Sequence, residues 1–177
     1  MKISKIKSYA KLNLALNITG KKKGLHKIES IICFLDLYDG ISINQYRGSK
    51  HKISFYGLFS KNIGTKNTVE KLFQKLDKEN LLKNKKFKIR INKKIPQKAG
   101  LGGGSMNAAS ILNYLIKNKF INVNHKNIRS ICDSIGSDVI LGTISSSCIL
   151  SSNGRIKKIY NIPKYYSILV KPNFGCS

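Results

Sequence analysis

The sequence of 177 residues predicts an α+β domain, and three observations lead to this fold class. Residues 9–18 and 87–92 alternate apolar and polar side chains, as strands with one buried face do. Residues 67–80 and 124–135 each begin with an asparagine that can cap a helix. A glycine-rich segment at residues 100–104 stands between a predicted strand and a predicted helix.

The remaining elements are predicted from similar signals along the chain. A helix is expected from Ala108 to near Asn118, and Gly136 is expected to end the helix that Asn124 begins. Asn153-Gly154 is a strong hairpin turn, whereas Asp39-Gly40 is expected to separate two strands. Further strands are expected at residues 29–37, 41–46, 51–56, 145–150, 155–160 and 165–171.

Composition sets the class of protein. A hydrophobic content of 41% in 177 residues supports one compact domain, with no apolar run long enough to cross a bilayer. No secretory signal is evident at the N-terminus. The cysteines are scattered without metal-ligand spacing, which favours reduced thiols, a cytoplasmic protein and no metal site of their own. They are Cys33, Cys132, Cys148 and Cys176.

The net charge of +25, from 33 Lys+Arg against 8 Asp+Glu, would attract any polyanion. The lysines are spread from end to end in a chain that is also rich in Ile and Asn, so compositional bias explains the charge better than a polyanionic partner does. No block is purely basic and aromatic-rich. The sequence therefore favours neither a nucleic-acid nor a membrane partner.

The glycine-rich segment is the main functional signal. Four glycines in residues 100–104 cost backbone entropy, so a bare backbone is needed there. A glycine loop that leads into a helix presents unpaired N–H groups, and the helix adds roughly half a unit of positive charge. Together these features predict a phosphate cradle, the alternative being a flexible connection. The loop fits neither the Walker motif nor the dinucleotide fingerprint.

Residues 96–109, with the pattern Pro-x-x-x-Gly-Leu-Gly-Gly-Gly-Ser-x-Asn-Ala-Ala, resemble the ATP loop of the GHMP small-molecule kinases. Residues 9–20, 24–26, 34–39 and 135–139 resemble other segments of that family, in the same order and at about its spacing. The resemblance implies a mixed sheet with helices on one side. It also implies an N-terminal ATP-binding domain at residues 1–171, with residues 172–177 beginning the connection to an absent C-terminal domain.

The resemblance implies that the loop holds the phosphates of ATP, with Mg²⁺ bridging them through ligands that stay unassigned. The residues expected to contact the nucleotide are Pro96, Gly100, Leu101, Gly102, Gly103, Gly104, Ser105 and Met106.

Two charged residues are the candidates for catalysis. Lys11 projects from a predicted strand on the same face as Asn13, and the resemblance places Lys11 beside the reacting oxygens. Asp138 is followed directly by apolar residues, which fits either a helix cap or a carboxylate that accepts the proton of a substrate hydroxyl. The resemblance favours catalysis for Asp138. It also implies substrate contacts for Asn13, His26 and Lys93.

The implied reaction is transfer of the γ-phosphate of ATP to the hydroxyl of a cytidine-diphosphate-linked alcohol. Leu25 stands where the family has a tyrosine that stacks on cytosine, so a kinase for another small alcohol is an alternative. Since family members are longer, a catalytically inactive remnant or a basic nucleic-acid-binding protein also stays open. If the chain is a kinase, a missing C-terminal half or self-association is expected to complete the site.

Overall fold

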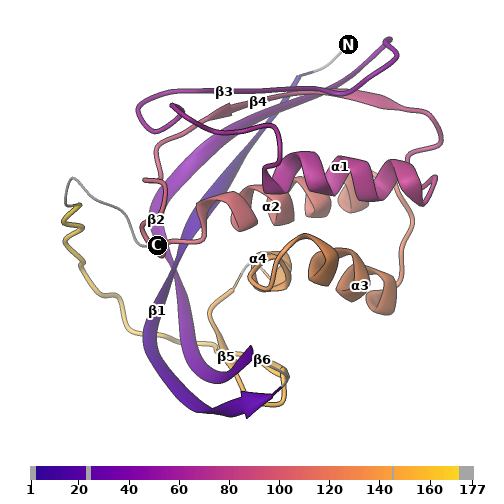
Figure 1. Ribbon diagram of the computed structural model, residues 1–177. Helices are drawn as coiled ribbons and strands as arrows, with labels where there is room; N and C mark the ends of the chain where they lie inside the picture. The colour runs from indigo at the N-terminus through magenta and orange to yellow at the C-terminus, as the bar shows by residue number, and fades with distance from the viewer. Residues whose placement is uncertain (1–2, 23–24, 145, 172–177) are drawn as a thin grey trace.

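The computed structural model describes residues 3–22, 25–144 and 146–171. These residues form a mixed β-sheet with helices packed along one of its faces (Figure 1). This arrangement is the α+β architecture that the sequence predicts. The expected interdomain connection at residues 172–177 lies outside the described residues.

The sheet has six strands in the order β3-β4-β2-β5-β6, and β1 pairs with β2 off this path. Strands β3 and β4 are parallel, whereas the other pairs are antiparallel. The strands are β1 (Ser4–Lys22), β2 (Leu25–Tyr46), β3 (Lys52–Tyr56), β4 (Lys86–Asn92), β5 (Cys148–Leu150) and β6 (Ile156–Lys158).

The helices are α1 (Thr68–Lys78), α2 (Gly103–Lys117), α3 (His125–Ile135) and α4 (Val139–Ile144). Both predicted asparagine caps are present. Asn67 Oδ1 accepts hydrogen bonds from the backbone N–H groups of Val69 and Glu70, both at 3.0 Å, and Asn124 Oδ1 accepts one from Asn127 at 2.9 Å. Among the described residues, no helix combines the length and apolar character that a bilayer crossing requires.

The main core lies between the sheet and the helices. Alternate residues of β2 and β4 are fully buried, as one face of a half-covered sheet should be. They pack against apolar residues of α1 and α2. The principal members are Ile41, Ile43, Phe87, Ile89, Ile91, Leu72, Phe73, Leu76, Ile111, Leu112 and Leu115.

The predicted break at Asp39-Gly40 is wrong, because β2 runs through it without interruption. Gly40 pairs with Lys7 of β1 on one side and with Asn92 of β4 on the other. An Asp-Gly pair was expected to turn the chain. Here the small glycine sits inside the sheet, and the aspartate is buried with partners of its own.

The predicted half-buried strand at residues 9–18 is only partly correct. Ala10 is fully buried, but Leu14, Leu16 and Ile18 are 47%, 50% and 64% exposed. Shifts of register between Asn13 and Ala15, and again between Ile18 and Gly20, interrupt the strict alternation of faces. This end of the β1–β2 ribbon extends past the helices (Figure 1), so its apolar side chains lack a covering layer.

The C-terminal part of the chain agrees in part with expectation. The predicted hairpin joins β5 to β6, with Gly154 at a φ of +79° in the turn. Residues 165–171, predicted as a strand, form none. Tyr166 and Ile168 are 105% and 93% exposed, so the apolar pattern of this segment does not reflect burial on the described chain.

His51 is a buried titratable group far from the glycine loop. Its ring lies 4.4 Å from that of Phe73, and its Nδ1 accepts a hydrogen bond from the backbone N–H of Phe87 at 3.1 Å. Burial lowers the pKa of His51 below its usual value of 6.5, although Asp77, whose Oδ2 lies 3.2 Å from His51 Nε2, opposes the shift. The folded protein therefore takes up this proton at lower pH than the unfolded chain does.

We predict that the free energy of unfolding falls as the pH is lowered from about 8 to about 5. Since the unfolded chain binds more protons in this range, protonation of His51 favours unfolding. Urea denaturation of the wild type and of His51→Gln at several pH values measures the effect. The variant should show the smaller pH dependence, and identical slopes would contradict the account.

Candidate functional site

A cavity of about 410 Å³ opens beside the glycine loop. The loop forms one wall, and the segment leading into α1 contributes another. The lining residues are Phe55, Ile63, Lys66, Asn67, Thr68, Val69, Lys93, Pro96, Gln97, Lys98, Ala99, Gly100, Leu101, Gly102, Gly103, Gly104, Ser105 and Asn107. Pro96 and residues 100–105, which the sequence predicts to hold phosphates, therefore line this cavity.

The loop needs glycine at two positions because its backbone is left-handed there. Gly100 and Gly102 have φ values of +71° and +65°, which residues with a side chain adopt at a cost. Gly102 is the N-cap of α2, and its carbonyl accepts the first hydrogen bond of the helix, from Met106 N at 2.9 Å. The N–H groups before Met106 have no intrahelical acceptor and are available to an anion.

Lys11 packs directly against the loop. A Cβ atom at Gly102 would lie only 2.8 Å from Lys11 Cγ, and one at Gly103 would lie 3.0 Å from Ile95 Cγ2. The backbone N–H of Lys11 donates to the carbonyl of Leu101 at 3.0 Å. Strand β1 is therefore joined to the loop by a backbone hydrogen bond and by close packing that only glycine permits.

The structure brings Lys11 and Asp138 together. Lys11 Nζ lies 3.2 Å from Asp138 Oδ2 and donates to Asn13 Oδ1 at 2.6 Å. Asn13 Nδ2 donates to Ser30 Oγ at 2.6 Å, which turns the amide oxygen of Asn13 toward the ammonium. The Asp138 side chain is 35% exposed whereas that of Lys11 is 10% exposed, so the carboxylate is the more accessible partner.

Asp138 also occupies a helix-start position. It immediately precedes α4, and its backbone carbonyl accepts a hydrogen bond from Leu141 N at 3.2 Å. Its carboxylate pairs with Lys11. The turn that carries it runs beside the loop, because a Cβ at Gly136 would lie 3.9 Å from Ser105 Oγ. Asp138 therefore stands at the start of a helix while its carboxylate pairs with Lys11, and both sequence alternatives stay predictions.

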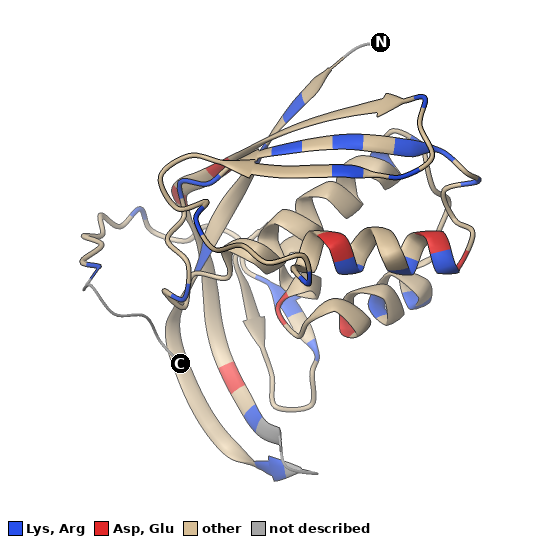
Figure 2. Cartoon of the chain, turned by 45° about the horizontal axis from the view of Figure 1, so that its top comes forward, with Lys and Arg blue, Asp and Glu red and all other residues tan. Residues whose placement is uncertain are grey.

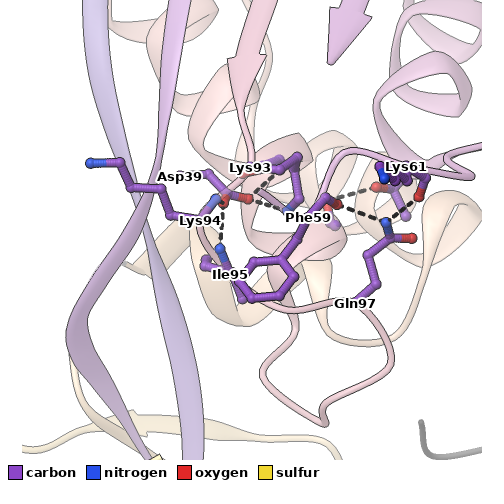
Figure 3. A network of polar contacts seen from close by, with 10 residues as sticks. Asp39, Phe59, Lys61, Lys93, Lys94, Ile95 and Gln97 are labelled. Carbon is purple, nitrogen blue, oxygen red and sulfur yellow. Dashed lines mark hydrogen bonds and ion pairs between the residues drawn. The ribbon is translucent and has the colours of Figure 1, made fainter. Parts of the chain in front are cut away.

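Asp39 is a residue of the candidate site that the sequence did not reveal. Its fully buried carboxylate forms an ion pair with Lys93 Nζ. Oδ1 accepts hydrogen bonds from Lys94 N and Ile95 N at 2.8 and 2.9 Å, and Oδ2 accepts one from Asn107 Nδ2 at 2.9 Å (Figure 3). One carboxylate therefore fixes both ends of the glycine loop.

Asp39 lies within a long run of residues typical of a strand, and this run could have indicated a buried aspartate. The Asp39-Gly40 pair was interpreted as a turn instead. Lys93, predicted as a substrate contact, lines the cavity, but its ammonium is committed to Asp39 and the residue is only 4% exposed. The ammonium of Lys93 therefore helps to hold the loop, and its ion pair with Asp39 leaves it little freedom to contact a substrate.

Two other predicted residues differ from expectation. The Met106 side chain does not line the cavity but packs with Ile32, Leu141 and Cys148. Its position one turn into α2 directs it toward the core. The side chain of His26 lies outside the described part of the chain, and only its backbone pairing with Lys21 in the β1–β2 ribbon is described.

A second tie holds the approach to the loop. Gln97 Nε2 donates to the backbone carbonyls of Phe59 and Lys61, both at 2.7 Å (Figure 3). This contact joins the loop to the segment that follows β3. The loop is therefore anchored on both sides before any ligand binds.

Comparison with known proteins agrees with this architecture. Residues 65–149 match the family described as GHMP kinases N terminal domain. The chain is 57% identical over 173 residues to 4-diphosphocytidyl-2-C-methyl-D-erythritol kinase of Pelagibacter ubique (strain HTCC1062), covering 98% of this chain and 62% of that protein. A kinase of the same name from Clostridium perfringens (strain SM101 / Type A) is 36% identical over 181 residues, with 98% and 60% covered.

Solved structures show the same fold at low identity. A crystal structure of 4-(cytidine 5'-diphospho)-2C-methyl-D-erythritol kinase matches with a TM-score of 0.70 at 23% identity, covering 88% of this chain and 55% of that chain. Lactococcus lactis galactokinase complexed with galactose matches with a TM-score of 0.64 at 13% identity, covering 89% and 47%. The chain spans about three-fifths of the length of the curated relatives it matches.

We predict that Gly102→Ala weakens ATP binding by at least about tenfold. The added methyl group meets Lys11, and the left-handed backbone adds a cost of roughly 1–2 kcal/mol. Isothermal titration with a non-hydrolysable ATP analogue measures the loss.

Two alanine variants are matched controls for this prediction. Gly100→Ala has the same backbone strain but open space, and Gly64→Ala has open space at a glycine for which no positive φ is found. The expected order of loss is Gly102→Ala, then Gly100→Ala, then Gly64→Ala. Wild-type affinity in Gly102→Ala would contradict the proposed cradle.

Proposed function

This chain carries the N-terminal domain of the GHMP kinases, and from that premise we propose that it phosphorylates the hydroxyl of 4-diphosphocytidyl-2-C-methyl-D-erythritol with ATP. The observation that carries the proposal is the 57% identity over 173 residues to a kinase of that name. Such a reaction belongs to non-mevalonate isoprenoid precursor synthesis. Because the chain spans 62% of that relative, the activity of the whole protein is an inference.

The loop supports ATP as the phosphate donor. The residues of the loop and of the start of α2 line a cavity together with Asn67 and Thr68. A triphosphate needs several preorganised donors, whereas the nucleoside needs polar and apolar wall atoms. The backbone N–H groups of residues 100–105 supply the first requirement, and Pro96 and the residues before α1 supply the second.

Mg²⁺ is part of the proposal. Protein-bound Mg²⁺ typically uses one or two protein oxygens in addition to phosphates and water. The Ser105 hydroxyl, which lines the cavity, is an oxygen donor of this kind and would hold the ion. When bound, the ion neutralises charge on the phosphates.

We propose that Asp138 accepts the proton of the substrate hydroxyl. Lys11 Nζ lies 3.2 Å from its carboxylate and keeps it oriented, so Asp138 can accept the hydrogen bond and then the proton of a substrate hydroxyl. Lys11 also offsets negative charge that develops on the transferred group. Asn13 holds Lys11 by its 2.6 Å hydrogen bond and contributes to the substrate side of the site.

Substrate recognition is proposed for His26, at the turn end of the β1–β2 ribbon. A second candidate function is supported at the same place. Leu25 cannot stack on a cytosine as an aromatic residue can, which favours a kinase for a different small alcohol. The two candidates share the loop, Lys11 and Asp138, and differ only in the acceptor.

The cytoplasm is the proposed compartment. Three described cysteines, Cys33, Cys132 and Cys148, are free thiols. Burial is the main reason that the pKa of Cys132 is raised to about 11, so this thiol stays protonated and unreactive at neutral pH. These features fit a reducing environment.

We predict that the protein transfers phosphate from ATP to 4-diphosphocytidyl-2-C-methyl-D-erythritol and leaves mevalonate, galactose and homoserine unphosphorylated. Coupled detection of ADP, with mass spectrometry of the products, makes the comparison. Faster phosphorylation of another alcohol would favour the second candidate. Nucleotide binding without phosphorylation of any acceptor would contradict both.

Asp138→Asn is the matched catalytic control in that experiment. The substitution preserves shape but removes the proton acceptor, so turnover should fall by at least about a hundredfold while the affinity for the ATP analogue survives. Unchanged turnover would refute the role assigned to Asp138.

A further inference from the structure

The face of the sheet that points away from the helices is strongly basic. In paired strands, directly opposite residues share a face. One such row joins Lys5, Ser42, Arg90 and Ser54, and the next joins Asn44, Lys88 and Lys52. All four cations in these rows are exposed, whereas the alternate residues Ile41, Ile43, Ile89 and Ile91 are buried against the helices. We call Lys5, Lys52, Lys88, Arg90 and Tyr56 the basic face.

A hollow of about 400 Å³ lies on this face. Its lining residues include three cations, three neutral side chains that can form hydrogen bonds, and no carboxylate. They are Ile3, Lys5, Ser42, Asn44, Tyr56, Lys88 and Arg90. None of them lines the cavity beside the glycine loop, so the two sites are separate.

Aromatic rings accompany the cations. Tyr56 is 43% exposed, and the Arg90 guanidinium carbon lies 5.3 Å from the centre of its ring. Lys52 Nζ lies 5.4 Å from the centre of the Tyr46 ring on the same side of the sheet. Tyrosines flanked by cations suit nucleobases, which stack on aromatic rings while their phosphates contact lysine and arginine.

Acidic residues are concentrated elsewhere. Figure 2 shows lysine and arginine along the strands, while several acidic positions lie on the helices. Among them, Glu70 and Asp77 belong to α1 and Asp133 belongs to α3. Lys7 lies near the edge of the basic face. The pKa of Lys7 is raised mainly by Tyr38, then by Tyr9 and, more weakly, by Asp36. The positive charge of the basic face is therefore not balanced by carboxylates within its rows.

We propose that the basic face binds single-stranded nucleic acid. The hollow takes backbone phosphates through Lys5, Lys88 and Arg90, and Tyr56 stacks on a base. Ser42 and Asn44 offer hydrogen bonds to sugar or base edges. The hollow has one exposed aliphatic side chain, Ile3, too little apolar surface for the insertion that membrane-surface helices achieve. This activity is independent of the proposed kinase reaction.

The test distinguishes RNA binding by the basic face from RNA binding that depends only on the net charge of the protein. Lys5→Gln/Lys88→Gln/Arg90→Gln changes the basic face, and Lys71→Gln/Lys78→Gln/Lys126→Gln removes the same charge from exposed positions of α1 and α3. Fluorescence anisotropy with labelled polyuridine RNA, over a range of salt concentrations, measures binding by the whole chain. Unchanged circular dichroism and an unchanged affinity for the ATP analogue verify the fold of both variants.

The basic-face variant should bind RNA at least about tenfold more weakly and lower the salt slope by about two, whereas the control should stay within about twofold of wild type. Tyr56→Leu should lose about fivefold or more. Equal losses in the two triple variants would overturn the proposal, because net charge alone would then explain binding. Tighter binding to phosphatidylserine vesicles than to RNA, or no binding to RNA, would also overturn it. Asp138→Asn should bind RNA normally, so failure of the kinase assignment leaves this result unaffected.

Discussion

The buried carboxylate of Asp39 is the interaction on which the site depends. A buried charge is costly unless its lone pairs are satisfied. Asp39 meets this condition with an ammonium, two backbone N–H groups and one side-chain amide. Because these donors come from the end of β4 and from α2, the carboxylate fixes the segment between them. The glycine loop is therefore held by donors on both sides of it.

This anchoring adds to the packing of Leu101, which is buried with Ala10 and Ile95. Gly102 admits Lys11 at a distance that a methyl group would not allow, and Gly103 lies close to Ile95. The resulting contact places the Lys11–Asp138 pair beside the free N–H groups of the loop. Donors that are positioned before the ligand arrives need little reorganisation during a reaction. Phosphoryl transfer depends mainly on such positioning and electrostatics.

Local signals in the sequence predicted local structure well. Asn67 and Asn124 cap helices, because each pattern acts within a few residues. The glycine segment leads into a helix as predicted, but α2 begins at Gly103 and not at Ala108, so Gly103 and Gly104 belong to its first turn. The approach of Lys11 to Asp138 was expected from the family resemblance, since no short-range pattern connects β1 with the turn before α4.

The errors arose where tertiary contacts overrule local preference. Asp39-Gly40 is a good turn sequence, but pairing on both sides keeps Gly40 inside β2. Leu14, Leu16 and Ile18 have a buried pattern on a ribbon that leaves the core. The basic face could not be predicted either, because its residues come from the three strands β1, β3 and β4 and meet only through the register of the sheet.

The most direct test of the central claim is a titration with a non-hydrolysable ATP analogue followed by amide proton–nitrogen correlation spectra. If the free N–H groups of the loop bind the phosphates, the amides of residues 100–105 should show the largest saturable shifts. The side-chain amide of Asn107, next to Asp39, should respond with them. Shifts spread over the lysine-rich surface, with the loop amides unchanged at saturation, would contradict the account.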